Sequence, residues 1–470
     1  MTSRPVPAER ELALYAVLVS TLMAGIATVG EPGFGMAVAA FLALSLLAYK
    51  SILALPSTIF LLLTAKPVID LAWRWRFMTI AEQGVNVQSV VATFVIMVAG
   101  FGLVLRRQCL VVSKTAILFL VFATVSVGLT PTSWGINELI RLYAAVSVYF
   151  LAGTVLQSEK RFERFARYYI VAVMVPVLLS FLQKAGLLQF EYWDWLEGGP
   201  VGRASGTYQH PLGLIYFVVY ATPLALYLFE RSSRSWFSRL RLGLFIGLCA
   251  VAVGLTYHRA GILAIGLEMW LWMIVTKRYG RAAIVAMVSG LVALLLSHWV
   301  VPLYANVIEV LHGSVTFTSG EFLRGRGMNW YLFLSSLFSS HPLYWILGRG
   351  GSVAEGFVPG FGYWSSNEPH NDFIRILHAY GLVGLGLYLA LIASFVRQGF
   401  RLRRARDSFS RGLGNLVIVV VVAMVLLSIT TEPMRFPTGA WYLFMLGSVA
   451  TVRCRWLVCA GAGARPLRNR

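Results

Sequence analysis

Charged residues are scarce in this chain. Asp, Glu, Lys and Arg make up 13% of its 470 residues, whereas hydrophobic residues make up 58%. A soluble protein of this length could not bury so much apolar surface. Many apolar runs approach or exceed the roughly 18–20 residues that cross a bilayer, without the alternation typical of a transmembrane β-barrel. The composition therefore predicts an all-α polytopic membrane protein.

Cysteine is also rare, and the common metal and cofactor motifs are missing. The four cysteines are Cys109, Cys249, Cys454 and Cys459. Their spacing fits no metal site, and we expect no disulfide. No P-loop, H-E-x-x-H or C-x-x-C motif occurs. Glu368, His370 and Asp372 in "EPHND" could offer ligands to a metal, but alternating ligands in a loop are weak support. We predict no metal and no cofactor.

Acidic residues are half as numerous as basic ones, 20 against 40, which gives a net charge of +20. Nucleic-acid binding would require basic residues gathered on a polar domain. Here they lie in short loops between apolar runs, such as "SEKRFERFAR" and "RLRRARDSFSR". That distribution follows the positive-inside rule. It predicts no nucleic-acid partner and places both termini in the cytoplasm.

The apolar runs predict about 12–14 transmembrane helices. We expect them over residues 12–30, 33–49, 51–72, 87–105, 114–130, 137–156, 167–187, 211–229, 242–257, 260–276, 281–301, 372–397, 412–430 and 436–452. The chain then divides into N-terminal transmembrane helices (1–301), a large external loop (302–371), C-terminal transmembrane helices (372–452) and a basic cytoplasmic tail (453–470). Within the loop, "YLFLSSLFSSHPLYWIL" predicts an interfacial or re-entrant helix interrupted by Pro342.

Several arginines fall on the external side, where the charge rule does not call for them. They are Arg203, Arg259, Arg324, Arg326, Arg349 and Arg435. Each could snorkel to headgroups or pair with an acidic residue such as Glu138, Glu368 or Glu432. Together they also suit an anion, because forked guanidinium donors bind phosphates. All seven histidines fall at the same side, which indicates polar chemistry there.

The helix that follows the loop carries further polar and small residues. Asn371, Arg375 and His378 share one of its faces by i, i+4, i+7 spacing. They either support a site or line a cavity, and we favour the cavity. Gly381 and Gly384 form a small-xx-small step that predicts close helix packing.

Five motifs occur in order between about residues 200 and 390: "GRASGTYQHPLGLIYFVVYATPLAL", "TYHRAGILA", "RGRGMNW", "LGRGG" and "PHNDFIRILHAYGLVGL". With the long loop that they bracket, the chain resembles the bacterial O-antigen ligase and polysaccharide polymerase superfamily. The resemblance implies a GT-C-like fold with a periplasmic loop before the last three helices. It also implies a protein of the bacterial inner membrane, with its active site on the periplasmic side. The donor would be an undecaprenyl-pyrophosphate-linked glycan, and the acceptor a glycan or lipid A core.

The resemblance further implies catalytic roles for Arg203, Arg259 and His370. The residues expected to bind substrate are Arg324, Arg326, His210, His258, Asn371 and Trp330. In the family the helix-mouth arginine often follows Ser, whereas Arg259 follows His258. Both His258 and His370 are therefore candidates for the base, and the loop arginine is Arg324 or Arg326.

The residue types suit this chemistry. Fixed guanidinium groups can stabilise a pyrophosphate leaving group without a metal. A neutral imidazole can accept the acceptor hydroxyl's proton, and nearby arginines keep it neutral. Direct attack would invert the anomeric configuration. Ligase, polymerase and O-glycosylation ligase acting on protein remain open. The alternatives from other classes are a flippase or transporter of lipid-linked saccharide and a non-catalytic assembly subunit, although transporter-like repeat symmetry is not evident.

Overall fold

The computed structural model describes residues 55–70, 76–80, 83–105, 110–189, 192–196, 199–208, 210–231, 236–280, 282–283, 287, 326–351 and 368–461. The helices predicted over 12–30 and 33–49 lie outside these residues, as does nearly all of the helix predicted over 281–301. Arg324 also lies outside them.

Seven helices in the described part of the chain are long and apolar enough to cross a membrane. They are α6 (Ser133–Val155), α7 (Glu159–Lys184), α8 (Pro211–Arg231), α9 (Trp236–Gly254), α15 (Asp372–Arg403), α16 (Ser408–Thr430) and α17 (Pro437–Gly461). Four further helices in the described residues pack with them: α3 (Leu55–Ile69), α4 (Val87–Leu105), α5 (Lys114–Leu129) and α10 (Arg259–Val275). The prediction of a helical polytopic membrane protein is confirmed.

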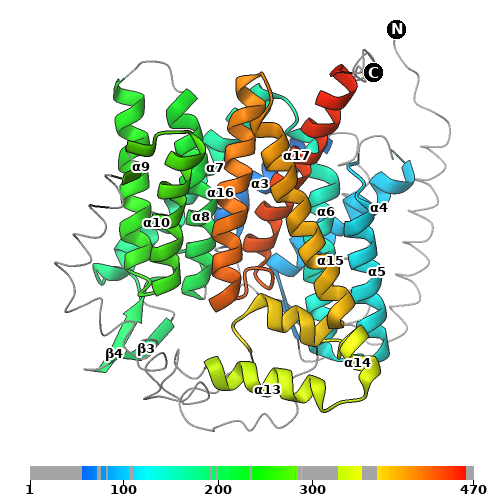
Figure 1. Ribbon diagram of the computed structural model, residues 1–470. Helices are drawn as coiled ribbons and strands as arrows, with labels where there is room; N and C mark the ends of the chain where they lie inside the picture. The colour runs from blue at the N-terminus through cyan, green and yellow to red at the C-terminus, as the bar shows by residue number, and fades with distance from the viewer. Residues whose placement is uncertain are drawn as a thin grey trace, which may run out of the picture.

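The helices form one bundle, and two short helices lie across one of its ends (Figure 1). α8 and α16 lie inside, because most of their residues are buried. α6 packs along α17, and α15 packs along α16 and α5. α13 (Arg326–Phe338) and α14 (Pro342–Leu347) lie across the lower end of the bundle in Figure 1. Their break at residues 339–341 agrees with the predicted interruption at Pro342. We call the end of the bundle where α13 lies the α13 end.

Two antiparallel hairpins were not predicted. β1 (Arg76–Ile80) pairs with β2 (Gln83–Asn86), and β3 (Tyr192–Leu196) pairs with β4 (Gly199–Arg203). The second hairpin lies at the α13 end (Figure 1). Its sequence signal was the "EGG" between two short segments, since a two-residue connection with glycine favours a tight hairpin. It matters for the site because β4 ends at Arg203.

α15 is kinked at Gly381, where φ is 65° and ψ is −170°. Only glycine adopts this conformation readily. The kink leaves two carbonyl groups without their helical partners, and the N–H groups of Arg349 and Gly350 donate to them, to His378 O at 2.8 Å and to Ala379 O at 2.9 Å. The prediction that Gly381 serves close helix packing is therefore incomplete. The main effect of this glycine is to turn the first part of α15.

A group of buried polar residues joins three distant parts of the chain inside the bundle. Lys66 in α3 and Asp70 directly after its last residue form an ion pair, and the two residues are 2% and 0% exposed. The Tyr208 hydroxyl contacts Asp70 and Thr438, and the Thr438 hydroxyl donates to Asp70 Oδ2 at 3.2 Å. A buried carboxylate requires such partners. The group therefore anchors the segment after β4 to α3 and α17.

Candidate functional site

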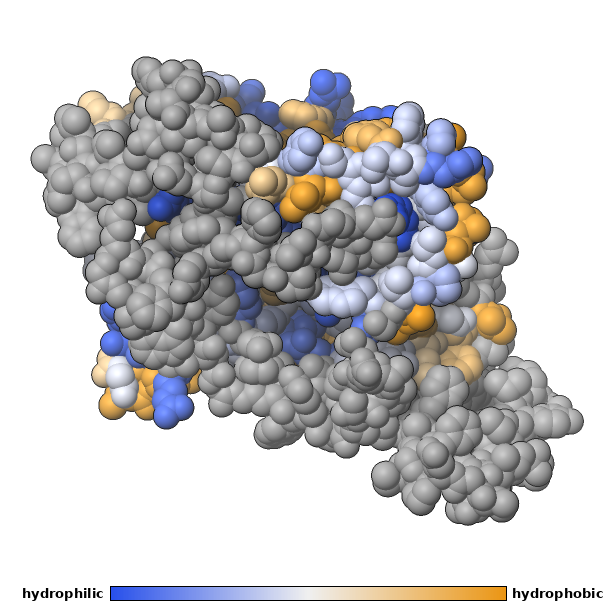
Figure 2. Space-filling view, turned by 90° about the horizontal axis from the view of Figure 1, so that it is seen from below, coloured by the Kyte–Doolittle hydropathy of each residue, from blue (hydrophilic) through white to orange (hydrophobic). Residues whose placement is uncertain are grey.

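Arginines and histidines from four separate segments converge at the α13 end. We call them the arginine–histidine cluster: Arg203, His210, His258, Arg326 and His370. The charges of Arg203 and Arg326 act on both His210 and His258, and both of these imidazoles also interact with His370. In the view from below, hydrophilic residues are visible toward the middle of this end (Figure 2). The structure thus brings together five of the nine predicted site residues.

Arg203 holds the end of β4 against the turn between α9 and α10. Its side chain is 8% exposed, and its Nε donates to the carbonyl of Thr256 at 2.7 Å. One residue on, the N–H of Ala204 donates to Leu255 O at 3.1 Å. The backbone contacts leave the guanidinium fixed in direction, as a preorganised anion donor requires.

His258 and Arg259 open α10. His258 is the N-cap, and its Nδ1 accepts from the N–H of Gly261 at 3.3 Å. Because Nδ1 is an acceptor, the neutral ring carries its proton on Nε2. Arg259 is the first helical residue and half-buried. The start of α10 therefore lies where the imidazole of His258 meets Arg203 and Arg326.

All three imidazoles of the cluster are neutral near pH 7. Burial lowers the pKa of His210 to about 3, and the Arg203 charge adds to this. Burial also lowers the pKa of His370 to about 3, helped by Arg326, and lowers the pKa of His258 well below its usual value. The predicted effect of nearby arginines is confirmed in direction, although burial is the larger cause.

His370 stands in a left-handed backbone conformation, with φ at 50°. Its N–H donates to Glu432 Oε1 at 3.0 Å. From α13, Asn329 Nδ2 donates to Glu368 O at 3.1 Å, and Trp330 Nε1 donates to Pro369 O at 2.7 Å. A non-glycine residue keeps this conformation only when its surroundings hold it. The indole N–H of Trp330 is thus used to hold the segment, and its contact with substrate stays a prediction.

Asn371 caps α15. Its Oδ1 accepts from the N–H groups of Phe373 and Ile374, at 2.9 and 3.1 Å, and its Nδ2 donates to Ile429 O at 3.0 Å. These contacts account for the position of Asn371 at the helix start without a ligand, as expected for an N-cap. Substrate binding by Asn371 also stays a prediction.

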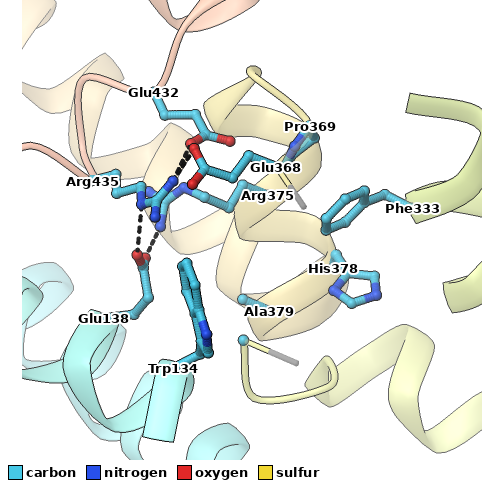
Figure 3. A pocket seen from close by; sticks show the side chains of 11 residues that line it. Trp134, Glu138, Phe333, Glu368, Pro369, Arg375, His378, Ala379, Glu432 and Arg435 are labelled. Carbon is cyan, nitrogen blue, oxygen red and sulfur yellow. Dashed lines mark hydrogen bonds and ion pairs between the residues drawn. The ribbon is translucent and has the colours of Figure 1, made fainter. Parts of the chain in front are cut away.

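Next to His370 lies a network of carboxylates and arginines (Figure 3). Arg435 pairs with Glu368, and it lies 3.5 Å from Glu432 and 3.6 Å from Glu138. Arg375 pairs with Glu138 as well. These two arginines therefore follow the predicted alternative, pairing with acidic residues, although the charge of Arg435 also acts on His210. Arg349 is separate too, since its Nη1 donates to Ser336 Oγ at 3.0 Å.

The network forms one wall of a small pocket. The lining is completed by Trp134, Phe333, Gly351, Pro369, His378 and Ala379. Phe333 and His378 stand across the pocket from the charged side chains (Figure 3), with their rings edge to face at 4.9 Å. The Arg435 guanidinium lies 5.1 Å from the ring of Trp134. Of the three residues predicted to share this face, Arg375 and His378 line the pocket and Asn371 does not. Trp134 and Phe333 were missed, because no local motif marks them.

Glu368, His370 and Glu432 have ligand atoms within 4.8 Å of one another, the closest approach to a metal site among the described residues. Arg435 already supplies positive charge between the two carboxylates, and Arg326 acts on His370. A divalent cation would meet repulsion from both arginines. We therefore assign no metal to this group.

The arrangement can bind an anion beside a neutral imidazole and hold a second polar molecule in the adjoining pocket. Comparison of the sequence with protein-family models and with curated proteins gives no match.

Proposed function

We propose that the protein is a membrane glycosyltransferase of the O-antigen ligase or polysaccharide polymerase type. It transfers a glycan from an undecaprenyl-pyrophosphate carrier to an acceptor hydroxyl at the periplasmic face of the bacterial inner membrane. One observation carries the proposal: Arg203, Arg326 and His370 converge from distant segments at one end of a membrane bundle. Forked cations beside a neutral base suit a phosphate-linked donor and a hydroxyl acceptor.

The cluster supports each part of the reaction. The acceptor oxygen bonds to the anomeric carbon while the bond from that carbon to the pyrophosphate oxygen breaks. The electron pair leaves with the pyrophosphate, whose charge Arg203, Arg259 and Arg326 stabilise. The hydroxyl proton passes to a ring nitrogen of His370 and then to solvent. Attack from the face opposite the leaving group inverts the anomeric configuration.

In the protein without donor, a pKa of about 3 makes His370 a weak base. The donor changes this, because its pyrophosphate offsets the nearby Arg326 charge and favours the imidazolium. Donor binding therefore raises the pKa of His370 toward the working pH, where general-base catalysis is most effective. The base becomes competent only when the donor is in place.

The glycan profile of cells lacking this gene tests the proposal. Bare lipid A core with long chains left on the carrier identifies a ligase. Core capped by a single repeat, or loss of long exopolysaccharide, identifies a polymerase. Cells complemented with His370→Gln or Arg203→Ala should keep the deletion profile at wild-type protein level. His341→Asn is the matched control, because His341 is exposed and only caps α14. Full restoration by His370→Gln and Arg203→Ala would refute the proposal.

A further inference from the structure

The pocket next to His370 is distinct from the arginine–histidine cluster. None of Arg203, His210, His258, Arg259 or Arg326 lines it. It is nevertheless contiguous with His370, because Pro369 lines it and Glu432, another lining residue, accepts the His370 N–H at 3.0 Å. A molecule in the pocket thus lies beside the same histidine as an anion in the cluster.

The two regions differ in charge. Arg203 and Arg326, beside three neutral histidines, make the cluster positive. In the pocket, Arg375 and Arg435 face Glu138, Glu368 and Glu432. Burial raises the pKa of Glu432 to about 8, so two positive charges oppose two negative ones near pH 7. A phosphate would gain little electrostatic attraction from this balanced wall. Hydroxyl groups both donate and accept hydrogen bonds, so they suit a wall that offers arginine donors and carboxylate acceptors.

Besides Gly351, Pro369 and Ala379, the remaining lining residues are aromatic. Trp134 is 39% exposed, and Phe333 and His378 stand across from the charged wall (Figure 3). A sugar ring has an apolar face of C–H groups and a rim of hydroxyls. Aromatic rings bury such a face, while a few polar groups fix its orientation. The pocket therefore matches a neutral saccharide in both its apolar and its polar parts.

We propose that this pocket binds the acceptor saccharide, with Trp134 packing on the sugar ring and the Glu368–Arg435 pair contacting its hydroxyls. The inference rests on the proposed function and adds to it a division of the site. The anionic donor occupies the arginine–histidine cluster, the neutral acceptor occupies the pocket, and His370 lies between them. This assignment gives Trp134 and Arg435 binding roles that no sequence motif indicated.

Steady-state kinetics of the full chain in proteoliposomes test the division. The donor is the lipid-linked glycan extracted from the same cells, and the acceptor is their lipid A core oligosaccharide or free repeat unit. Trp134→Ala should raise the acceptor KM about three- to tenfold, the range expected for one aromatic contact, and leave the donor KM unchanged. Trp134→Phe should restore much of the loss. Trp270→Ala is the matched control, because Trp270 on α10 is also 39% exposed and does not line the pocket.

A binding measurement separates this inference from the proposed function. In protein labelled with 5-fluorotryptophan, the ¹⁹F resonance that is missing from the spectrum of Trp134→Phe is assigned to Trp134. The core oligosaccharide or free repeat unit should shift that resonance without donor present. Transfer by the wild type combined with an unchanged acceptor KM in Trp134→Ala would overturn the pocket assignment alone. A shifted resonance with no transfer to any acceptor would instead support the pocket and refute the proposed function.

Discussion

Gly381→Ala should destabilise the protein more than any other single-methyl addition in α15. An alanine Cβ at this position would lie 2.2 Å from Ile346 O and 2.6 Å from the backbone nitrogen of Gly348. The backbone of α14 cannot retreat as a flexible side chain would. A residue with a side chain at φ 65° and ψ −170° is itself strained by about 1–3 kcal/mol. Overpacking adds about 1–3 kcal/mol, so the loss should total roughly 2–6 kcal/mol.

Gly386→Ala provides the matched control in the same helix. An added Cβ there meets no atom within 4 Å. Alanine favours a helix interior over glycine by about 0.5–1 kcal/mol, so this variant should be as stable as the wild type or more stable. Unfolding of both variants in detergent by added SDS, followed by circular dichroism, measures the difference. Equal midpoints for the two variants would refute the account of the kink.

The same pair of variants links the kink to the site. The kink turns the segment from Asp372 to Tyr380, which carries Arg375 and His378 of the pocket. Under the proposed function, Gly381→Ala protein that is still folded should therefore transfer glycan more slowly, whereas Gly386→Ala should transfer at the wild-type rate. Normal transfer by folded Gly381→Ala would show that the pocket does not depend on the kink.

Three further perturbations have defined outcomes. In the unfolded chain His370 binds a proton below about pH 6.5, whereas in the folded chain its pKa is about 3. The free energy of unfolding should therefore decrease as the pH falls from about 6.5 to about 3. Unfolding measured over this pH range should show a smaller decrease in His370→Gln. Asn371→Ala should lose about 1–2 kcal/mol with the α15 cap, and Asn371→Ser should recover part of it in the same unfolding assay. Tyr208→Phe should lose about 1–3 kcal/mol, because buried Asp70 loses a donor. Tyr227→Phe is its control, since the buried Tyr227 hydroxyl has no hydrogen-bond partner among the described residues, and equal losses in the two variants would contradict the reasoning.

The membrane helices could be predicted because each apolar run is long and continuous. α16 shows this well, since the run over 412–430 became a helix over Ser408–Thr430. The ends were less predictable. α15 continues to Arg403 and α17 to Gly461, beyond the predicted ends at 397 and 452. Arginine is a good helix former, so a helix can leave the bilayer without ending.

The pocket could not be predicted, because its parts meet only in the folded chain. Arg375 and Glu138 are 237 residues apart, and Glu432 is 62 residues from His370. A sequence shows such side chains as possible partners but not which arginine each carboxylate pairs with. The kink was hidden for another reason. A glycine in an apolar run is compatible both with close helix packing and with a turn, and the surroundings at α14 decide between them.

The Asp70–Tyr208–Thr438 contacts also bear on how the protein is made. Thr438 is translated 368 residues after Asp70. Before α17 is made, Asp70 can already contact Lys66 and the Tyr208 hydroxyl, but it lacks the Thr438 hydroxyl, and Tyr208 lacks its contact with Thr438. The contacts that hold the segment from Arg203 to His210 are therefore complete only after synthesis of a helix that supplies none of the residues of the arginine–histidine cluster. A nascent chain can contain every residue of that cluster before the last of these contacts can form.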